Sequence, residues 1–315
     1  MPTGTVRFAA LGDSLTEGVG APAADGWRGW AALLAPSLAE ADAPVEFRNL
    51  AASGALSGDL MECQLSQLID WKPQFAAVLA GGNDILRAGF DPLRTALALD
   101  AVLGELRADG AVLLTACLPD PGRLLGLPGP LARPLARRMA TVNELVHALS
   151  HRHGAVHLHL ARLPWHDERA LLSADRLHPS PSGHLLIARE FHALLAARGG
   201  PLGPAPTWVD ASAVPGRGAD LWWMATRGTA WVARRSVDLL PGLLALAAVE
   251  TSHRLRGGTA ALDARAVAEA AAALAALPAP GPEPEAPDLN TARGIPRHRP
   301  PALSDLPSDV RIRSS

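Results

Sequence analysis

The chain is predicted to fold as an α/β domain, in which a parallel sheet is covered by helices on both faces. Short apolar runs alternate with longer helical patterns over the first 198 residues, and residues typical of turns and caps separate them. This alternation favours a parallel sheet, because a right-handed helical crossover joins parallel strands. With 315 residues, of which 48% are hydrophobic, the chain can bury a sizeable core.

Each predicted element rests on a local pattern. The predicted strands are the apolar runs at residues 6–11, 45–51, 75–80, 111–118 and 155–160. The predicted helices are residues 27–41, 57–71, 91–108, 132–152 and 181–198. Two of the helices open with a cap residue and a proline, at Asp91-Pro92 and Ser180-Pro181.

The composition changes after residue 198, which predicts a domain boundary. We expect a catalytic domain at 1–198, a linker and helical extension at 199–277, and a disordered tail at 278–315. Within the extension, residues 219–250 predict two helices, the first with Trp222, Trp223 and Trp231 and the second with the apolar run 239–249. The Ala-rich residues 259–277 predict a further helix.

Charge and targeting signals exclude several classes of protein. The formal net charge of −2, without a broad basic stretch, argues against a nucleic-acid partner. The sequence predicts neither a cleaved signal peptide nor a membrane span, so we expect a cytoplasmic protein. Cys63 and Cys117 are expected to be buried apolar residues and not a disulfide framework.

Polar residues with catalytic potential follow three predicted strands and precede the last helix. Ser14 follows the first strand, Gly54 the second and Asn83 the third, and His178 comes three residues after Asp175. A serine hydroxyl is a weak nucleophile that needs a base, and a carboxylate can orient that base. Backbone and amide N–H groups can stabilise an oxyanion. Taken singly, each motif also fits a cap or a turn, but together they predict serine-based acyl transfer.

The motifs resemble the blocks of the SGNH hydrolases, also called the GDSL esterase/lipase family, in order and spacing over residues 5–198. The matching segments are Ala10-Leu11-Gly12-Asp13-Ser14-Leu15-Thr16-Glu17-Gly18, Asn49-Leu50-Ala51-Ala52-Ser53-Gly54, Gly81-Gly82-Asn83-Asp84, Asp175-Arg176-Leu177-His178-Pro179 and Ser182-Gly183-His184. The resemblance implies a three-layer α/β/α, flavodoxin-like fold whose five-stranded parallel sheet has the strand order 2-1-3-4-5.

The resemblance also implies a function and its residues. It implies a catalytic triad of Ser14, His178 and Asp175, and an oxyanion hole built by Ser14, Gly54 and Asn83. The expected substrate is a small-molecule acyl or acetyl ester or thioester, and no metal or cofactor is implied. An acyltransferase with the same triad stays open, as does a non-catalytic binding protein on the same fold, although the complete set of signature residues argues against the latter.

Five histidines cluster in the sequence from the end of the fourth predicted helix into the fifth predicted strand. They are His147, His151, His153, His157 and His159. A metal site is conceivable, but surface positions are favoured, because no cysteine or carboxylate is spaced to complete a tetrahedral set. We therefore expect no metal.

Aromatic and apolar residues elsewhere have two interpretations each. Trp27 and Trp30 could line an acyl pocket, although packing of a helix on the sheet is favoured for Trp30. Trp165 could contact the substrate or anchor the loop before Asp175. The apolar run 239–249 after Arg234-Arg235 could lie on a membrane surface or form a lid, but docking on the core is favoured.

Overall fold

The computed structural model contains the predicted five-stranded parallel sheet. It describes residues 5–39, 43–68, 70–165, 167–199, 203–207 and 229–279, with the backbone alone for residues 229–240. The strands are β1 (Val6–Gly12), β4 (Val45–Asn49), β5 (Phe75–Leu79), β6 (Val112–Ala116) and β7 (Val156–Leu158). Their order is β4-β1-β5-β6-β7, which confirms the predicted order 2-1-3-4-5.

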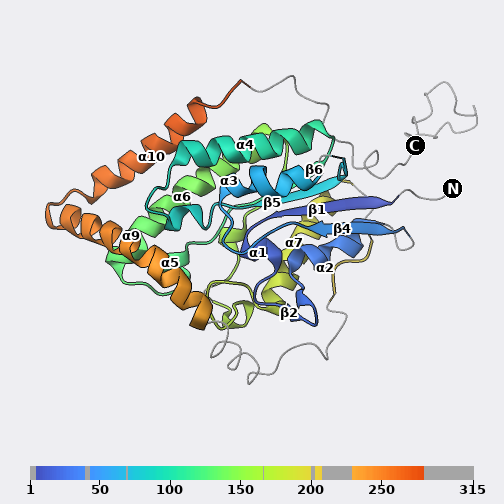
Figure 1. The fold of residues 1–315 in the computed structure, drawn as a ribbon, viewed down its shortest axis with the longest axis horizontal. Coiled ribbons are helices and arrows are strands. Elements are labelled where there is room, and N and C mark those ends of the chain that lie inside the picture. Colours follow the sequence, from blue (N-terminus) through green and yellow to red (C-terminus); the bar gives the residue numbers. More distant parts are fainter. Residues whose placement is uncertain are drawn as a thin grey trace, which may run out of the picture.

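Helices cover both faces of the sheet and complete a three-layer α/β/α fold (Figure 1). One layer holds α2 (Trp30–Leu34) and α7 (Pro181–Ala197), which pack against each other. The other layer holds α3 (Ser57–Asp59), α4 (Pro92–Ala108) and α6 (Gly129–Arg152). The fold class predicted from the sequence is therefore confirmed.

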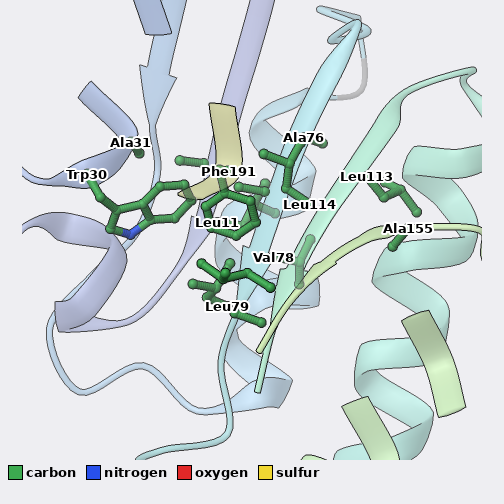
Figure 2. Packing of buried hydrophobic residues seen from close by; sticks show 14 of the residues in the cluster. Leu11, Trp30, Ala31, Ala76, Val78, Leu79, Leu113, Leu114, Ala155 and Phe191 are labelled. Atoms are coloured by element: carbon green, nitrogen blue, oxygen red, sulfur yellow. The ribbon is translucent and has the colours of Figure 1, made fainter. Parts of the chain in front are cut away.

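The hydrophobic core lies between the sheet and these two helical layers. All residues of β5 and β6 are buried, as expected for strands that are covered on both faces. In the core of the α2–α7 layer, Trp30 stacks on Phe191 with a centroid distance of 4.9 Å (Figure 2). Trp30 is thus a packing residue, as the sequence favours.

Short elements connect the strands to the helices, and two of them move the start of the first predicted long helix. They are α1 (Ser14–Glu17), β2 (Pro22–Ala23), β3 (Gly26–Trp27), η1 (Ala35–Leu38), η4 (Asp84–Leu86), α5 (Pro121–Leu124), η5 (Leu160–Arg162) and η6 (Arg169–Leu171). The predicted helix at 27–41 begins only at Trp30, because β2 and β3 pair as a small antiparallel hairpin directly before it.

The predicted helix at 57–71 is a chain of short helical turns, and its inner face differs from the prediction. The turns are α3, the π-helical η2 (Leu60–Gln64) and the 3-10 turn η3 (Leu65–Leu68). Gln64 is buried at 3% exposure, whereas Cys63 is exposed, so the prediction that Cys63 is buried is wrong. The reason is a polar contact, since the Gln64 amide satisfies the buried backbone at the end of β1.

The C-terminal extension contributes two helices, α9 (Thr229–Leu255) and α10 (Thr259–Ala275). The prediction of two helices within 219–250 is wrong for the described part: one helix runs through Pro241, and Trp222 and Trp223 lie outside the described residues. α9 packs against α6, and α10 packs against α4 and α6 (Figure 1). In the part of the chain described, no helix combines the length and hydropathy that a membrane span requires.

One ion-pair group fastens the extension to the domain. Arg137 of α6 pairs with Glu250 of α9 at 3.1 Å and with Asp263 of α10 at 2.8 Å. The Glu250 side chain is only 2% exposed, so the positive charge of the Arg137 guanidinium must offset the cost of burying the Glu250 carboxylate.

Candidate active site

Ser14 stands just beyond the end of β1, the strand between β4 and β5. β1 ends at Gly12, and Asp13 caps α1 by accepting a hydrogen bond from the Leu15 N–H at 3.1 Å. A Cβ atom at Gly12 would lie 2.2 Å from the Leu79 carbonyl oxygen, so only glycine permits this turn. The Gln64 amide accepts from the Gly12 N–H and donates to the Gly12 carbonyl, both at 2.8 Å. The backbone that carries Ser14 is thereby fixed.

The structure brings Ser14, His178 and Asp175 into one hydrogen-bonded chain. The Ser14 Oγ lies 2.7 Å from His178 Nε2, and His178 Nδ1 lies 2.6 Å from Asp175 Oδ2. His178 is 5% exposed, so water has little access to this chain. The arrangement places a base beside a hydroxyl and an orienting carboxylate behind the base, as serine-based acyl transfer requires.

The loop before α7 holds Asp175 in place by donating three hydrogen bonds to one oxygen of its carboxylate. Asp175 Oδ1 accepts from the Ser173 hydroxyl at 2.6 Å and from the backbone N–H groups of Leu177 and His178 at 2.9 and 3.0 Å. Burial acts to raise the pKa of Asp175, but its hydrogen bonds and the charge of His178 outweigh burial and lower the pKa below the ordinary value. Asp175 therefore stays ionised.

His184, in the second part of the last sequence motif, connects the two sides of the site. Its Nδ1 accepts from the Trp30 N–H at 3.2 Å, and its Nε2 lies 3.1 Å from the Val19 carbonyl oxygen. The residue is fully buried, and burial lowers its pKa to about 4, so the ring is neutral. It ties the start of α7 to the loop that follows Ser14, a positioning role that the motif alone did not reveal.

Two of the three predicted oxyanion donors, Ser14 and Asn83, border the same cavity, and Gly54 belongs to the loop whose Ala55 carbonyl accepts from Asn83. Gly54 has a φ of 86°, and within the described part of the chain its N–H and that of Ser14 donate to no other residue. Asn83 Nδ2 donates to the Ala55 carbonyl at 3.1 Å and makes a longer contact of 3.3 Å with Asp13 Oδ2. One amide proton of Asn83 is therefore firmly held, and the other is held weakly enough to turn to a ligand.

Two buried carboxylates support these donors, and the sequence reasoning assigned no role to either. Asp84 accepts from the Ser57 hydroxyl at 2.6 Å and from the Ser57 N–H at 3.0 Å, which joins the Asn83 loop to the Gly54 loop. The second carboxylate is Asp13, whose Oδ2 atom makes the 3.3 Å contact with the Asn83 amide. Burial raises the pKa of Asp13 to about 6. A polar residue directly before a helix is the signal that could have identified Asp13 as a cap.

An apolar cavity of about 360 Å³ opens beside Ser14. Its polar side carries Ser14, Asn83, Asp175 and His178. The rest is lined mainly by apolar side chains, among them Leu86, Leu118, Leu124, Met139, Leu160 and Leu243. Leu243 comes from α9, so the C-terminal extension forms part of the cavity wall.

The structure also decides between the interpretations of the tryptophans. Trp165 lines the cavity and donates from its indole N–H to the Leu160 carbonyl at 2.7 Å, so it both faces a ligand and anchors its loop. Trp27 and Trp30 are not among the described residues that line the cavity. This cavity therefore gives no support to the alternative that Trp27 and Trp30 line an acyl pocket.

The five histidines separate into two groups. His151 is exposed and His153 pairs with Asp100 at 2.7 Å, whereas the other three, His147, His157 and His159, gather around a cysteine. That cysteine is Cys117, which follows β6. The prediction that no cysteine is spaced to join these histidines is thus wrong, because Cys117 is brought to them by β6, the strand that pairs with β7.

Comparisons with known proteins identify the family and agree with this fold. A model of the GDSL-like Lipase/Acylhydrolase family matches residues 10–186, more than half of the chain. A comparison with curated proteins gave no match.

Two solved structures show the likeness of fold. LAE5, an α/β hydrolase from the metagenome of Lake Arreo, Spain, superposes with a TM-score of 0.50 and 22% sequence identity. The alignment covers 61% of this chain and 95% of LAE5. A catalytic mutant of Axe2, an acetylxylan esterase from Geobacillus stearothermophilus, is 18% identical with a TM-score of 0.50, over 62% of this chain and 96% of Axe2. The family match carries the assignment: the chain belongs to the GDSL-like lipase/acylhydrolase family and is a hydrolase of ester bonds.

Proposed function

We propose that this enzyme cleaves esters or thioesters with an apolar acyl chain through an acyl-enzyme formed on Ser14. The observation that carries the proposal is the Ser14–His178–Asp175 chain at the polar side of an apolar cavity. A polar substrate would leave most of this wall without partners, whereas an acyl chain would fill it.

In the first half-reaction, the Ser14 Oγ bonds to the acyl carbon while its proton passes to His178 Nε2. The N–H groups of Ser14 and Gly54 and the Asn83 amide donate to the carbonyl oxygen as it becomes negative. When the tetrahedral intermediate collapses, the bond to the alcohol or thiol breaks, and the leaving group takes the proton from His178.

In the second half-reaction, water repeats these steps on the acyl-enzyme. His178 takes a proton from the water, whose oxygen bonds to the acyl carbon, and returns the proton to the Ser14 Oγ as the acid leaves. Asp175 keeps the same tautomer of His178 throughout and stabilises the imidazolium while it carries the extra proton.

A panel of nitrophenyl esters of increasing chain length tests both the nucleophile and the cavity. Ser14→Ala should lose nearly all activity and all labelling by a fluorophosphonate probe, whereas Ser66→Ala, an exposed serine, should behave as wild type. Each buried methylene contributes about 0.8 kcal/mol, so kcat/KM should rise about fourfold per methylene until the cavity is full. A profile that is highest for acetate would refute the assignment of the cavity to the acyl chain.

The α9 wall allows a sharper test of the cavity. Leu243→Trp should shift the best substrate to shorter chains, because a larger side chain takes up space that the acyl chain would fill. The matched control is Leu244→Trp, since Leu244 is the next residue on α9 and is 55% exposed. Equal profiles for the two variants would show that α9 does not border the bound acyl chain.

A further inference from the structure

Strand pairing and helix packing gather one cysteine and three histidines on one face of the sheet. Thr115 of β6 pairs with His157 of β7. Because alternate residues of a strand share a face, Cys117 and His159, each two residues further on, lie on the same face as that pair. Helix α6 contributes His147, whose ring lies against both histidines of the β7 segment. We call these four residues the Cys–His cluster.

The distances within the Cys–His cluster are close to those of a metal site. The three pairs of histidine ring centroids are 4.7, 5.2 and 5.0 Å apart. Cys117 Sγ lies 3.9 Å from His159 Nδ1, and one potential ligand atom from each residue falls within 4.8 Å of all the others. Ligand atoms around tetrahedral zinc are about 3.3 to 3.8 Å apart, so small rotations of the rings would close the site.

A chain of hydroxyl groups sets the tautomer of His157. The Ser150 hydroxyl donates to the Val146 carbonyl, and the Thr115 hydroxyl lies 2.7 Å from Ser150 Oγ, to which it must donate. Both hydroxyl protons are then used. His157 Nδ1, at 3.0 and 3.1 Å from these two oxygens, is therefore the donor, and Nε2 carries the free lone pair. The hydroxyls act as the outer partners that orient a metal-ligating histidine.

Two nitrogens of the Cys–His cluster are buried without a hydrogen-bond partner among the described residues. They are the Nε2 atoms of His147 and His157. A buried polar atom without a partner costs about 1 to 3 kcal/mol, so two in one cluster require an explanation. Burial lowers the pKa of both rings, that of His157 to about 4, and neutral imidazole is the form that binds a metal ion.

We propose that the cluster binds one structural Zn²⁺ ion through four ligands, Cys117, His147, His157 and His159. One thiolate and three imidazoles satisfy the preference of zinc for four sulfur and nitrogen ligands. The thiol proton leaves on binding, so the site carries a net charge of +1, and the exposed His159 opens it to solvent.

The zinc site would fasten one wall of the substrate cavity. Leu118 and Leu160 line the cavity and are the chain neighbours of Cys117 and His159. Asn143 of α6 already holds the Leu118 backbone through hydrogen bonds of 2.7 and 2.8 Å. The ion would add a link between the ends of β6 and β7 and α6, independent of the proposed roles of Ser14 and His178.

Metal binding by the untagged full-length protein tests the proposal. After treatment with a chelator, the protein should take up one equivalent of Zn²⁺, and its melting temperature should rise with Zn²⁺. Co²⁺ should give the visible bands of a tetrahedral ion and a thiolate charge-transfer band, which should persist in Cys63→Ser. The double variant Cys117→Ser with His157→Gln should bind at least about 100-fold more weakly, whereas His151→Gln, on the same helix as His147, should bind as wild type.

Three outcomes would overturn the proposal. The first is wild-type protein that binds less than one equivalent of Zn²⁺. The second is a Co²⁺ complex without a thiolate band, or one whose thiolate band disappears in Cys63→Ser. The third is a double variant that retains wild-type affinity. The cobalt spectrum needs no variant of the cluster, so the test holds even if the double variant fails to fold.

Discussion

Replacing Asp175 by asparagine should remove most of the activity while it leaves the loop intact. Asp175 Oδ1 accepts three hydrogen bonds, from Ser173, Leu177 and His178. The asparagine oxygen must take this position, since the amide NH₂ cannot accept those protons. The NH₂ group then faces His178 Nδ1, which must present its lone pair, and the ring proton moves to Nε2.

A proton on His178 Nε2 prevents that atom from accepting the Ser14 proton. A base held in the wrong tautomer costs about 10⁴-fold in kcat, or about 5 kcal/mol of transition-state stabilisation. Asp175→Asn should therefore show this loss in kcat with short esters, with a small change in KM, because asparagine has nearly the size of aspartate and the apolar wall of the cavity is unchanged. Its circular dichroism should match wild type, since the three loop contacts remain.

The control is Asp91→Asn, which makes the same chemical change at a helix cap far along the chain. Asp91 accepts from the N–H groups of Leu93 and Arg94 at 2.9 and 3.4 Å, and asparagine caps helices equally well. Its activity should be that of wild type. If Asp175→Asn kept more than a tenth of wild-type kcat, the tautomer argument would be refuted.

Three further predictions concern the oxyanion donors, pH and the extension. Asn83→Ala should lower kcat by about 100- to 1000-fold with little change in KM, and steady-state kinetics showing the reverse would contradict its role as a donor. Because burial raises the pKa of Asp13 from 3.8 to about 6, the folded state binds this proton more tightly. Ionisation of Asp13 should thus lower the free energy of unfolding by up to about 3 kcal/mol as the pH rises from about 4 to about 6. Urea unfolding across this pH range should show the decrease in the wild type and not in Asp13→Asn. Arg137→Ala should lower the free energy of unfolding by about 3 to 5 kcal/mol by leaving Glu250 buried and unpaired, and the exposed Arg265→Ala should change it by less than about 0.5 kcal/mol.

The sequence by itself determined the sheet, its strand order through the family resemblance, and the residues of the candidate site. These features depend on short-range patterns: buried strands are apolar runs, and Asp91 and Ser180 mark helix starts by local capping. Because parallel strands bring their carboxyl ends to one edge, motifs that follow successive strands had to lie near one another. For the same reason Ser14, Gly54, Asn83 and the Asp175 loop could be named before their distances were known.

The tertiary structure alone decided the contacts between residues whose spacing in the sequence carries no signal. Gln64 reaches the Gly12 backbone across 52 residues, and Leu243 enters the cavity from a helix outside the repeating strand–helix pattern. Cys117 meets the histidines only through the register of β6 on β7 and the position of α6. Local patterns fix which residues are buried, but the register of strands and the packing of helices fix which buried residues meet, and these emerge only when the whole core is assembled.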